Sequence, residues 1–212
     1  MNTICLTADS AKTRITPSKV VCIGRNYVDH IHELANEIPD ELVVFFKPNS
    51  AITDNLAALH LGDELHYEAE LSFLYQQGKF TAVALGLDLT KRAVQAKLKA
   101  KGLPWERAKA FDGSALFSDF VAIEQNQLDN LMLSLLINGE ERQLGGVELM
   151  MVKPDEILNE LQTFTQLEDG DIVMTGTPKG VGMVKAGDSF SGKVSLQEKK
   201  NNALISCEWL AK

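Results

Sequence analysis

The sequence predicts a strand-rich α+β fold with a few short helices. Three observations carry this prediction: residues 64–75 alternate between apolar and polar side chains, several apolar runs have the length of one strand, and few segments repeat at helical spacing. Side chains on a strand point alternately to the two faces of a sheet, whereas an amphipathic helix repeats about every 3.6 residues. At 212 residues the chain is long enough for one buried core, so we expect a single domain spanning 1–212.

The composition argues against several classes of partner. The 21 basic and 29 acidic side chains give a net charge of −8, which disfavours nucleic acid or an anionic membrane surface as a partner. No apolar run approaches the roughly 18 residues of a membrane span, and residues 1–10 lack a secretory signal, so we expect a cytoplasmic protein. Cys5, Cys22 and Cys207 are odd in number and widely separated, which favours reduced thiols over disulfides or a metal finger.

The N-terminal part predicts a strand followed by a short helix. Residues 20–23 form an apolar run that ends at Gly24, and the candidate N-cap of the helix that follows is Asn26 or Asp29. The apolar face of this helix consists of Val28, Ile31, Leu34 and Ala35.

His30 and Glu33 are i, i+3 neighbours on this helix. At that spacing a carboxylate reaches an imidazole, orients it and raises its basicity, as a general base requires. The alternative is a solvated surface pair. A second apolar run, 42–46, predicts a buried strand that ends at Lys47, which is either an exposed loop residue or a cation at the edge of a site.

The alternating stretch 64–75 separates an apolar face from an acidic one. The apolar face consists of Leu65, Tyr67, Ala69, Leu71, Phe73 and Tyr75, and the polar face of Glu64, His66, Glu68, Glu70 and Ser72. On one strand Glu68 and Glu70 lie roughly 6.5–7 Å apart, and they repel each other unless solvent or a cation separates them. A divalent cation with oxygen ligands would resolve that conflict. The alternative is a half-exposed strand with a solvated acidic face.

A second strand, 80–89, follows the turn at 76–79 and predicts an antiparallel pair with the first. Asp88 closes this strand and precedes a helix with a basic face at 89–101, so it is either the N-cap of that helix or a metal ligand. Pairing of the two strands would bring Asp88 beside Glu68 and Glu70. Farther along, Lys109 is flanked by alanines and is therefore less solvated than most lysines.

The C-terminal half predicts two hairpins, a helix and a glycine-rich loop. The strand 131–137 turns back at Asn138–Gly139, a helix spans 153–164, and 190–196 pairs with 203–209 across Asn201–Asn202. Five glycines, at 170, 176, 180, 182 and 187, surround the strand 171–174. Their spacing matches neither of the common phosphate-binding motifs, so nucleotide binding has no motif support.

The motifs, taken together, resemble the fumarylacetoacetate hydrolase family, in particular its small acylpyruvate hydrolases and oxaloacetate decarboxylases. The resemblance is carried by C-I-G-R-N-Y-V-D-H-I-H-E at 22–33, F-F-K-P at 45–48, H-Y-E-A-E-L at 66–71, L-D-L-T-K-R-A-V-Q at 87–95, K-G-L-P-W at 101–105, A-K-A-F-D at 108–112 and G-D-I-V-M-T-G-T-P-K-G-V-G at 170–182. It implies a mixed β-sandwich or roll of the type found in the C-terminal domain of that family, usually as a homodimer.

The same resemblance implies a site. It implies that Glu68, Glu70 and Asp88 hold Mg²⁺ or Mn²⁺, that Lys109 lies near the metal, and that His30 and Glu33 lie on a lid helix. The expected substrate-binding residues within these motifs are Arg25, Asn26, Tyr27, Lys47 and Thr177.

The expected chemistry is cleavage of a small anionic 2-oxo acid. A hard cation chelates such an acid and stabilises a pyruvate enolate, which forms when an acylpyruvate is hydrolysed or oxaloacetate loses CO₂. In hydrolysis, His30 would activate the water. Two alternatives stay open: an isomerase or tautomerase that moves a proton of an enolised 2-oxo acid, and a non-catalytic module that binds a cation or ligand.

Overall fold

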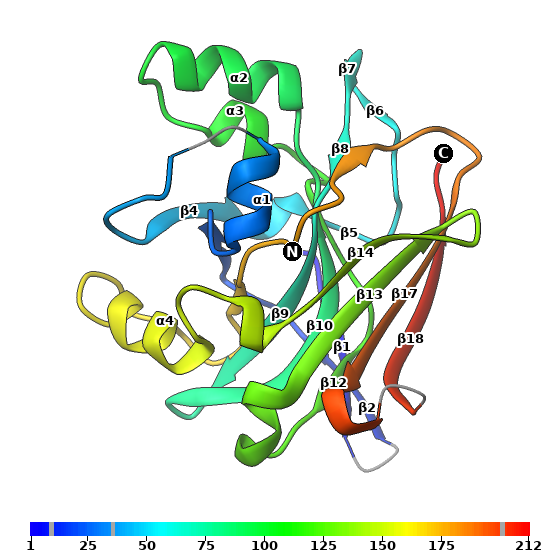
Figure 1. Ribbon diagram of the computed structural model, residues 1–212. Coiled ribbons are helices and arrows are strands. Elements are labelled where there is room, and N and C mark those ends of the chain that lie inside the picture. The colour runs from blue at the N-terminus through cyan, green and yellow to red at the C-terminus, as the bar shows by residue number, and fades with distance from the viewer. Residues whose placement is uncertain (9–10, 35–36, 200–201) are drawn as a thin grey trace.

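The computed structural model describes residues 1–8, 11–34, 37–199 and 202–212. In this part of the chain two β-sheets pack face to face, with short helices at the periphery (Figure 1). The larger sheet has ten strands, with the main order β2 (Ala11–Ile15), β1 (Ile4–Ala8), β12 (Phe120–Ala122), β10 (Lys79–Asp88), β9 (Ala69–Gln76), β15 (Ile172–Met174), β3 (Lys19–Gly24) and β4 (Val43–Pro48). The pairs β1–β12 and β15–β3 are parallel, so the sheet is mixed, as expected for this fold class.

The remaining strands extend the large sheet, form a second sheet or make two small ladders. Off the main order, β11 (Ala115–Phe117) pairs with β10 and with β5 (Ile52–Thr53). The four-stranded sheet has the order β14 (Glu140–Gly146), β13 (Leu131–Ile137), β17 (Ser189–Leu196) and β18 (Ala203–Leu210). The ladders are β6 (Leu59–His60) with β7 (Asp63–Glu64), and β8 (His66–Tyr67) with β16 (Gly182–Met183).

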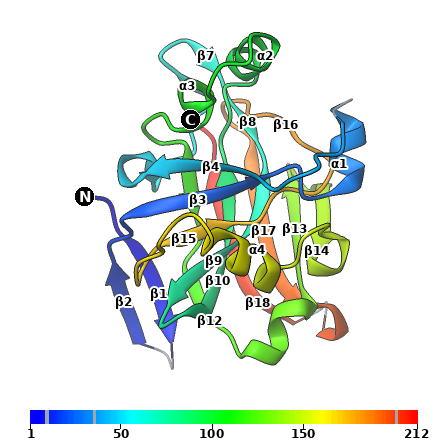
Figure 2. The ribbon, with the colours of Figure 1, turned by 90° about the vertical axis from the view of Figure 1, so that its left-hand side faces the viewer.

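Four short α-helices are described. They are α1 (Val28–Glu33), α2 (Arg92–Ala100), α3 (Glu106–Lys109) and α4 (Pro154–Leu161), and single 3₁₀ turns occur at Asn49–Ala51, Gln125–Asn130, Val147–Leu149 and Gln197–Lys199. In both views α1, α2 and α3 gather in the upper half of the molecule, above the long strands of the four-stranded sheet (Figure 1 and Figure 2). None of the described helices is long and apolar enough to cross a membrane.

The core lies between the two sheets, where the apolar face predicted for 64–75 is found. Leu71 and Phe73 of β9 are fully buried in the same cluster as Leu133 and Phe190 of the small sheet. Leu65, Tyr67 and Ala69 belong to this cluster as well, and Tyr75 packs against its edge. Each fully buried large apolar side chain contributes about 1.5–3 kcal/mol, so this face is a main source of stability. The predicted apolar face is confirmed.

The opposite face of the same stretch is not the solvated acidic face that was the alternative, because Glu68, Glu70 and Ser72 are buried. The stretch is not one strand: it is divided into β7, β8 and β9. Ser72 is fully buried, and a second cluster packs on that face around Val20, Cys22, Leu74 and Met174. The reason is that β9 lies in the interior of the large sheet, between β10 and β15, where both faces of a sheet are covered.

The predicted turns and hairpins are confirmed, whereas the N-caps considered for α1 and α2 are wrong. Asn138 and Gly139 both have positive φ, 53° and 83°, as a tight two-residue hairpin requires. The N-cap of α2 is Lys91, because Asp88 still belongs to β10, and the N-cap of α1 is Tyr27 without a side-chain cap. The helix predicted at 153–164 is confirmed as the shorter α4.

The other predicted connections fall partly outside the described residues. The hairpin of β17 and β18 is confirmed, but Asn201 in its connection lies outside the described residues, as does Ala35 after α1. Cys5, Cys22 and Cys207 are free thiols, as predicted.

Candidate functional site

Three carboxylates meet at the end of the β9–β10 pair. Gly86 of β10 pairs with Glu70 of β9, and two residues later the Asp88 N–H donates a hydrogen bond of 2.9 Å to the Glu68 carbonyl. Glu68, Glu70 and Asp88 therefore each place a carboxylate oxygen within 4.8 Å of the other two, although all three residues are at most 5% exposed. The strand pairing thus brings together the three residues that the sequence indicated.

Two glycines lie close to the carboxylates. A Cβ at Gly86, which pairs with Glu70, would lie 2.3 Å from the Ser72 hydroxyl oxygen, so a larger residue there would require the Ser72 side chain to move. Gly176, which follows β15 with φ of 93°, donates its N–H to Glu70 Oε2 at 2.8 Å. Because residues with a side chain rarely adopt this φ, glycine is favoured there.

The carboxylate set fits a hard divalent cation. Burial, together with the negative charges of Asp88 and Glu68, raises the pKa of Glu70 well above its usual range. Asp88 Oδ1 is buried and accepts no hydrogen bond from the described residues, although the Lys47 ammonium lies 2.9 Å away. Three buried oxygen donors in mutual repulsion are the ligands that Mg²⁺ or Mn²⁺ prefers.

Lys109, at the end of α3, lies among these carboxylates. Its ammonium donates to Glu68 Oε2 at 2.7 Å, Asp88 Oδ2 at 2.6 Å and Thr90 Oγ1 at 2.7 Å. Burial alone would lower the pKa of Lys109, but Asp88 and Glu68 raise it above its usual value, so the side chain stays charged. Burial alone would raise the pKa of Glu68, but the positive charges of Lys109 and Arg92 keep that pKa below its usual range. The expectation that Lys109 is poorly solvated is met.

The interaction of Arg92 with Glu68 was not anticipated from the sequence. The Arg92 guanidinium pairs with Glu68 and donates at 2.9 Å to Gln95 Oε1, its i+3 neighbour on α2. In the sequence Arg92 and Gln95 lie on a predicted helix with many other basic residues. Only the position of Arg92 four residues after Asp88 could have distinguished it from the others.

His30 and Glu33 form the predicted pair. His30 Nδ1 lies 3.1 Å from Glu33 Oε2, and Glu33 Oε1 accepts the Gly180 N–H at 2.9 Å. His30 is 7% exposed whereas Glu33 is exposed, so the imidazole is buried, unlike in the solvated alternative, and its partner carboxylate faces solvent. The loop that carries Gly180 thereby fixes the carboxylate that in turn orients the imidazole.

One cavity joins His30 to the three carboxylates. Its described lining comprises Ile23, Gly24, Arg25, His30, Leu34, Phe45, Glu68, Glu70, Asp88, Arg92, Gln95, Lys99, Trp105, Lys109, Gly176 and Thr177. His30 of α1 therefore faces the same space as the carboxylates of β9 and β10, and Arg25 and Thr177 reach it as well.

The other predicted substrate-binding residues, Asn26, Tyr27 and Lys47, do not belong to the described lining of the cavity and instead contact the segments around it. The Asn26 amide donates to the Thr175 carbonyl at 2.9 Å and to the Val152 carbonyl at 3.0 Å, which ties the start of α1 to two loops. The Tyr27 ring is in the core, where burial raises the pKa of its hydroxyl. Lys47 is fully buried and donates to the Lys109 and Ser114 carbonyls.

Gln143 of β14 is a further residue that sequence patterns did not single out. Its amide accepts the Ala69 N–H at 2.9 Å and donates to Thr177 Oγ1 at 2.8 Å and to the Pro178 carbonyl at 2.7 Å. Gln143 is 1% exposed and so links the strand of the carboxylates to the glycine-rich loop. An amide at the fourth position of a hairpin strand that begins with three charged residues carries no sequence signal for such a contact.

Comparison with known proteins agrees with this geometry. Residues 19–202 match the family described as fumarylacetoacetate (FAA) hydrolase C-terminal. The chain belongs to the fumarylacetoacetate hydrolase family. Membership of this family identifies the protein as an enzyme, and the family fold accounts for the strand-rich architecture.

Three known proteins are similar to this chain over most of their length. Oxaloacetate tautomerase YcgM of Escherichia coli is 38% identical over 190 residues, which cover 82% of this chain and 87% of that protein. The mitochondrial oxaloacetate tautomerase FAHD1 of Arabidopsis thaliana is 36% identical over 193 residues, with coverage of 84% and 86%. Fumarylpyruvate hydrolase from Pseudomonas aeruginosa, solved with Mn²⁺ and pyruvate, is 28% identical with a TM-score of 0.87, covering 100% and 96%.

Proposed function

We propose that this family member is a divalent-metal-dependent tautomerase that interconverts the enol and keto forms of a small 2-oxo acid, oxaloacetate in the first instance. One observation carries the proposal: His30, paired with Glu33, lines the same cavity as three buried carboxylates and the Lys109 ammonium. Two relatives that are 36–38% identical are named oxaloacetate tautomerases, and this supports our choice of isomerisation over the C–C cleavage that the sequence motifs suggested first.

The metal would be Mg²⁺ or Mn²⁺, held by Glu68, Glu70 and Asp88. When bound, such a cation supplies a Lewis acid that stabilises the negative charge developing on the substrate oxygens during enolisation. Lys109 adds a fixed positive charge at the same place, because its ammonium is already held by Glu68 and Asp88 and needs little reorganisation.

His30 would carry the proton. Its Nδ1 faces Glu33, so Nε2 is the nitrogen that exchanges a proton with the substrate. In the enol-to-keto direction a proton leaves the enol hydroxyl, the electron pair returns to form the C2 carbonyl, and C3 accepts a proton. Glu33 stabilises the imidazolium while His30 holds the proton.

Hydrolysis of an acylpyruvate is the second candidate, favoured by the structural similarity to fumarylpyruvate hydrolase. In that reaction His30 would take a proton from water, which attacks the distal carbonyl. The bond between that carbon and C3 then breaks, its electrons form a pyruvate enolate, and protonation at C3 gives pyruvate. The homodimer and the cytoplasmic location also remain part of this proposal.

Two assays test the proposal on one preparation with Mg²⁺ or Mn²⁺. In the first, loss of the enol form of oxaloacetate is followed by its absorbance while pyruvate is measured in parallel. Faster enol loss without pyruvate supports tautomerisation, whereas pyruvate from oxaloacetate indicates decarboxylation. In the second, acetylpyruvate and fumarylpyruvate are supplied, and pyruvate formation indicates hydrolysis. Inactivity towards all three acids would overturn the proposal and favour a binding module.

A further inference from the structure

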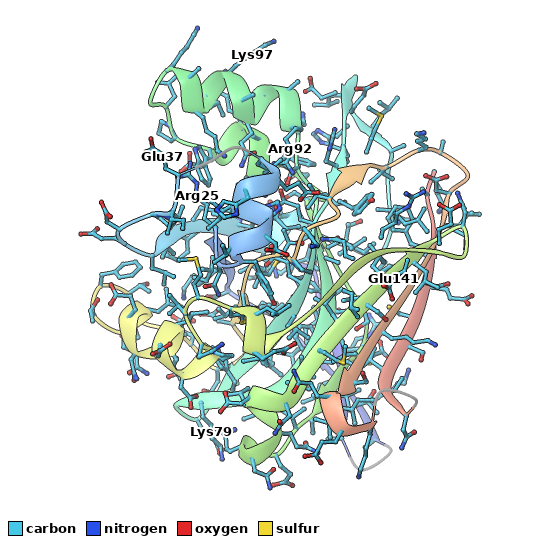
Figure 3. All side chains as sticks on the ribbon, viewed as in Figure 1. Arg25, Glu37, Lys79, Arg92, Lys97 and Glu141 are labelled. Carbon is cyan, nitrogen blue, oxygen red and sulfur yellow. The ribbon has the colours of Figure 1, made fainter. Side chains whose placement is uncertain are left out.

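Helix α2 turns one polar face toward the cavity. Arg92, Gln95 and Lys99 lie at i, i+3 and i+7, which places them on the same side of a helix, and all three line the cavity. Gln95 is 4% exposed. Lys97 lies on the outer side of α2, whereas Arg92 lies between α2 and α1 (Figure 3). The position of a residue around the helix axis, and not its charge alone, therefore decides whether its side chain reaches the cavity.

The cavity has more cationic than anionic side chains. Among the described lining residues the cations are Arg25, Arg92, Lys99 and Lys109, and the anions are Glu68, Glu70 and Asp88. With a divalent cation on three ionised carboxylates, this lining carries three net positive charges. A monocarboxylate substrate would offset one of them and a dicarboxylate two, so charge complementarity favours the dicarboxylate.

Lys99 is positioned for such a contact. Its ammonium lies 5.1 Å from the centre of the Trp105 ring, which holds the side chain at the cavity wall, and Trp105 in turn packs on Phe45 at 5.8 Å. Burial, and then the positive charges of Arg25 and Arg92, lower the pKa of Lys99 to about 8. Because neighbouring positive charges disfavour the charged form of Lys99, an anion beside its ammonium would stabilise that form.

Arg25 and Lys99 line the same cavity, and the Arg25 backbone adopts a φ of 58°. This left-handed conformation is uncommon for a residue with a side chain, and such conformations concentrate at functional sites. The turn after β3 thus directs the Arg25 side chain to the cavity lining.

We propose that Lys99, with Arg25 of the same lining, binds the distal carboxylate of the substrate, so that the site selects dicarboxylic 2-oxo acids over monocarboxylic acids of the same length. The inference rests on the proposed function, because the 1-carboxylate and 2-oxo group must occupy the carboxylate cluster and its cation. Lys99 is a specificity-determining residue in this proposal, and Lys97 on the same helix has no such role.

Unreactive ligands test the inference without turnover. Protein saturated with Mn²⁺ is titrated calorimetrically with malate and with 2-hydroxybutyrate, which share the chelating 2-hydroxy acid group but differ in the distal carboxylate. Oxalate, which chelates and has no distal group, serves as the reference. The wild type should bind malate more tightly than 2-hydroxybutyrate by about 10- to 100-fold, as expected for one charge-assisted hydrogen bond. Lys99→Met should abolish this preference, whereas Lys99→Arg and the control Lys97→Met should keep it.

The outcomes separate the two proposals. If oxalate fails to bind the Mn²⁺-saturated wild type, the chelating site and with it the proposed function are wrong. If oxalate binds but malate and 2-hydroxybutyrate bind equally well, only the dicarboxylate inference is overturned. A preference that Lys99→Met leaves unchanged also overturns it, because the distal carboxylate is then bound elsewhere.

Discussion

The backbone N–H of Asp88 donates to the carbonyl of Glu68 at 2.9 Å, one step beyond the last paired residues of β9 and β10. A single main-chain hydrogen bond therefore joins Asp88, the last residue of β10, to Glu68, the residue that immediately precedes β9. The third carboxylate, Glu70, pairs across the sheet with Gly86. The pairing of β9 and β10 thus holds the three carboxylates close together.

Glu70→Gln should weaken Mn²⁺ binding at least about tenfold, since one of three oxygen ligands loses its charge. Calorimetric titration with Mn²⁺ measures this change. Glu64→Gln is the matched control, because Glu64 is exposed in the same stretch and lies outside the cluster. Equal Mn²⁺ affinity in Glu70→Gln and the parent would show that the carboxylate cluster does not hold the cation.

The same residue predicts a pH dependence of the metal-free protein. The pKa of Glu70 in the folded state lies well above its unfolded value of about 4.3, so the folded state binds the extra proton. The contribution of Glu70 to stability is then complete below the unfolded pKa and is lost as the pH rises through the folded pKa. Melting temperatures measured with a chelator from pH 5 to 8 should decline in the wild type. The decline should be smaller in Glu70→Gln, and parallel curves would contradict the argument.

His30→Ala should slow enol–keto interconversion by about 10²–10⁴-fold, the usual contribution of a general base, while Mn²⁺ binding stays intact. Steady-state kinetics measure the loss, and His32→Ala on the exposed side of α1 is the control. The loss in acylpyruvate hydrolysis should exceed any loss in oxaloacetate decarboxylation, because only hydrolysis requires an activated water. Equal losses would mean that His30 positions the substrate or closes α1 over it.

Lys109→Met should lower kcat and also destabilise the metal-free protein. Removal of one partner from a buried ion pair typically costs about 3–5 kcal/mol, and here Glu68 and Asp88 would both lose their ammonium. Mn²⁺ should restore more stability to Lys109→Met than it adds to the wild type, because the cation takes over part of the lost charge compensation. Thermal melts with and without Mn²⁺ test this, with the exposed Arg107→Met of the same helix as control.

Gln143→Leu should destabilise the protein by about 1–3 kcal/mol, because the buried Ala69 N–H and Pro178 carbonyl lose their partner. Urea denaturation gives the free energy of unfolding. Arg142→Leu, at the neighbouring exposed position, should change it by less than about 0.5 kcal/mol. A Gln143→Leu protein as stable as the parent would show that these hydrogen bonds contribute little.

Local patterns predicted the strands and the hairpins well. The alternation from Leu65 to Phe73 identified a face that is buried in the core, and Asn138–Gly139 identified its hairpin, because side-chain period and turn conformation are properties of neighbouring residues. The i, i+3 spacing of His30 and Glu33 likewise predicted a contact of 3.1 Å. The predicted cap of α1 was wrong because the Asn26 side chain makes tertiary hydrogen bonds instead. Its amide donates to the Val152 and Thr175 carbonyls.

By itself the sequence determined which residues are the candidates for the chemistry: an acidic pair on a strand, a carboxylate at the end of the next, a lysine among alanines and an imidazole beside a glutamate. Only the tertiary structure decided how they are used. Glu70 of β9, and Glu68 directly before it, are buried because strands from distant parts of the chain cover both faces of β9. Similarly, Arg92 and Lys99 differ from the exposed Lys97 only because α2 packs one face on the cavity. Sequence spacing describes that face, but the surface against which it packs is set by contacts between segments far apart in the chain.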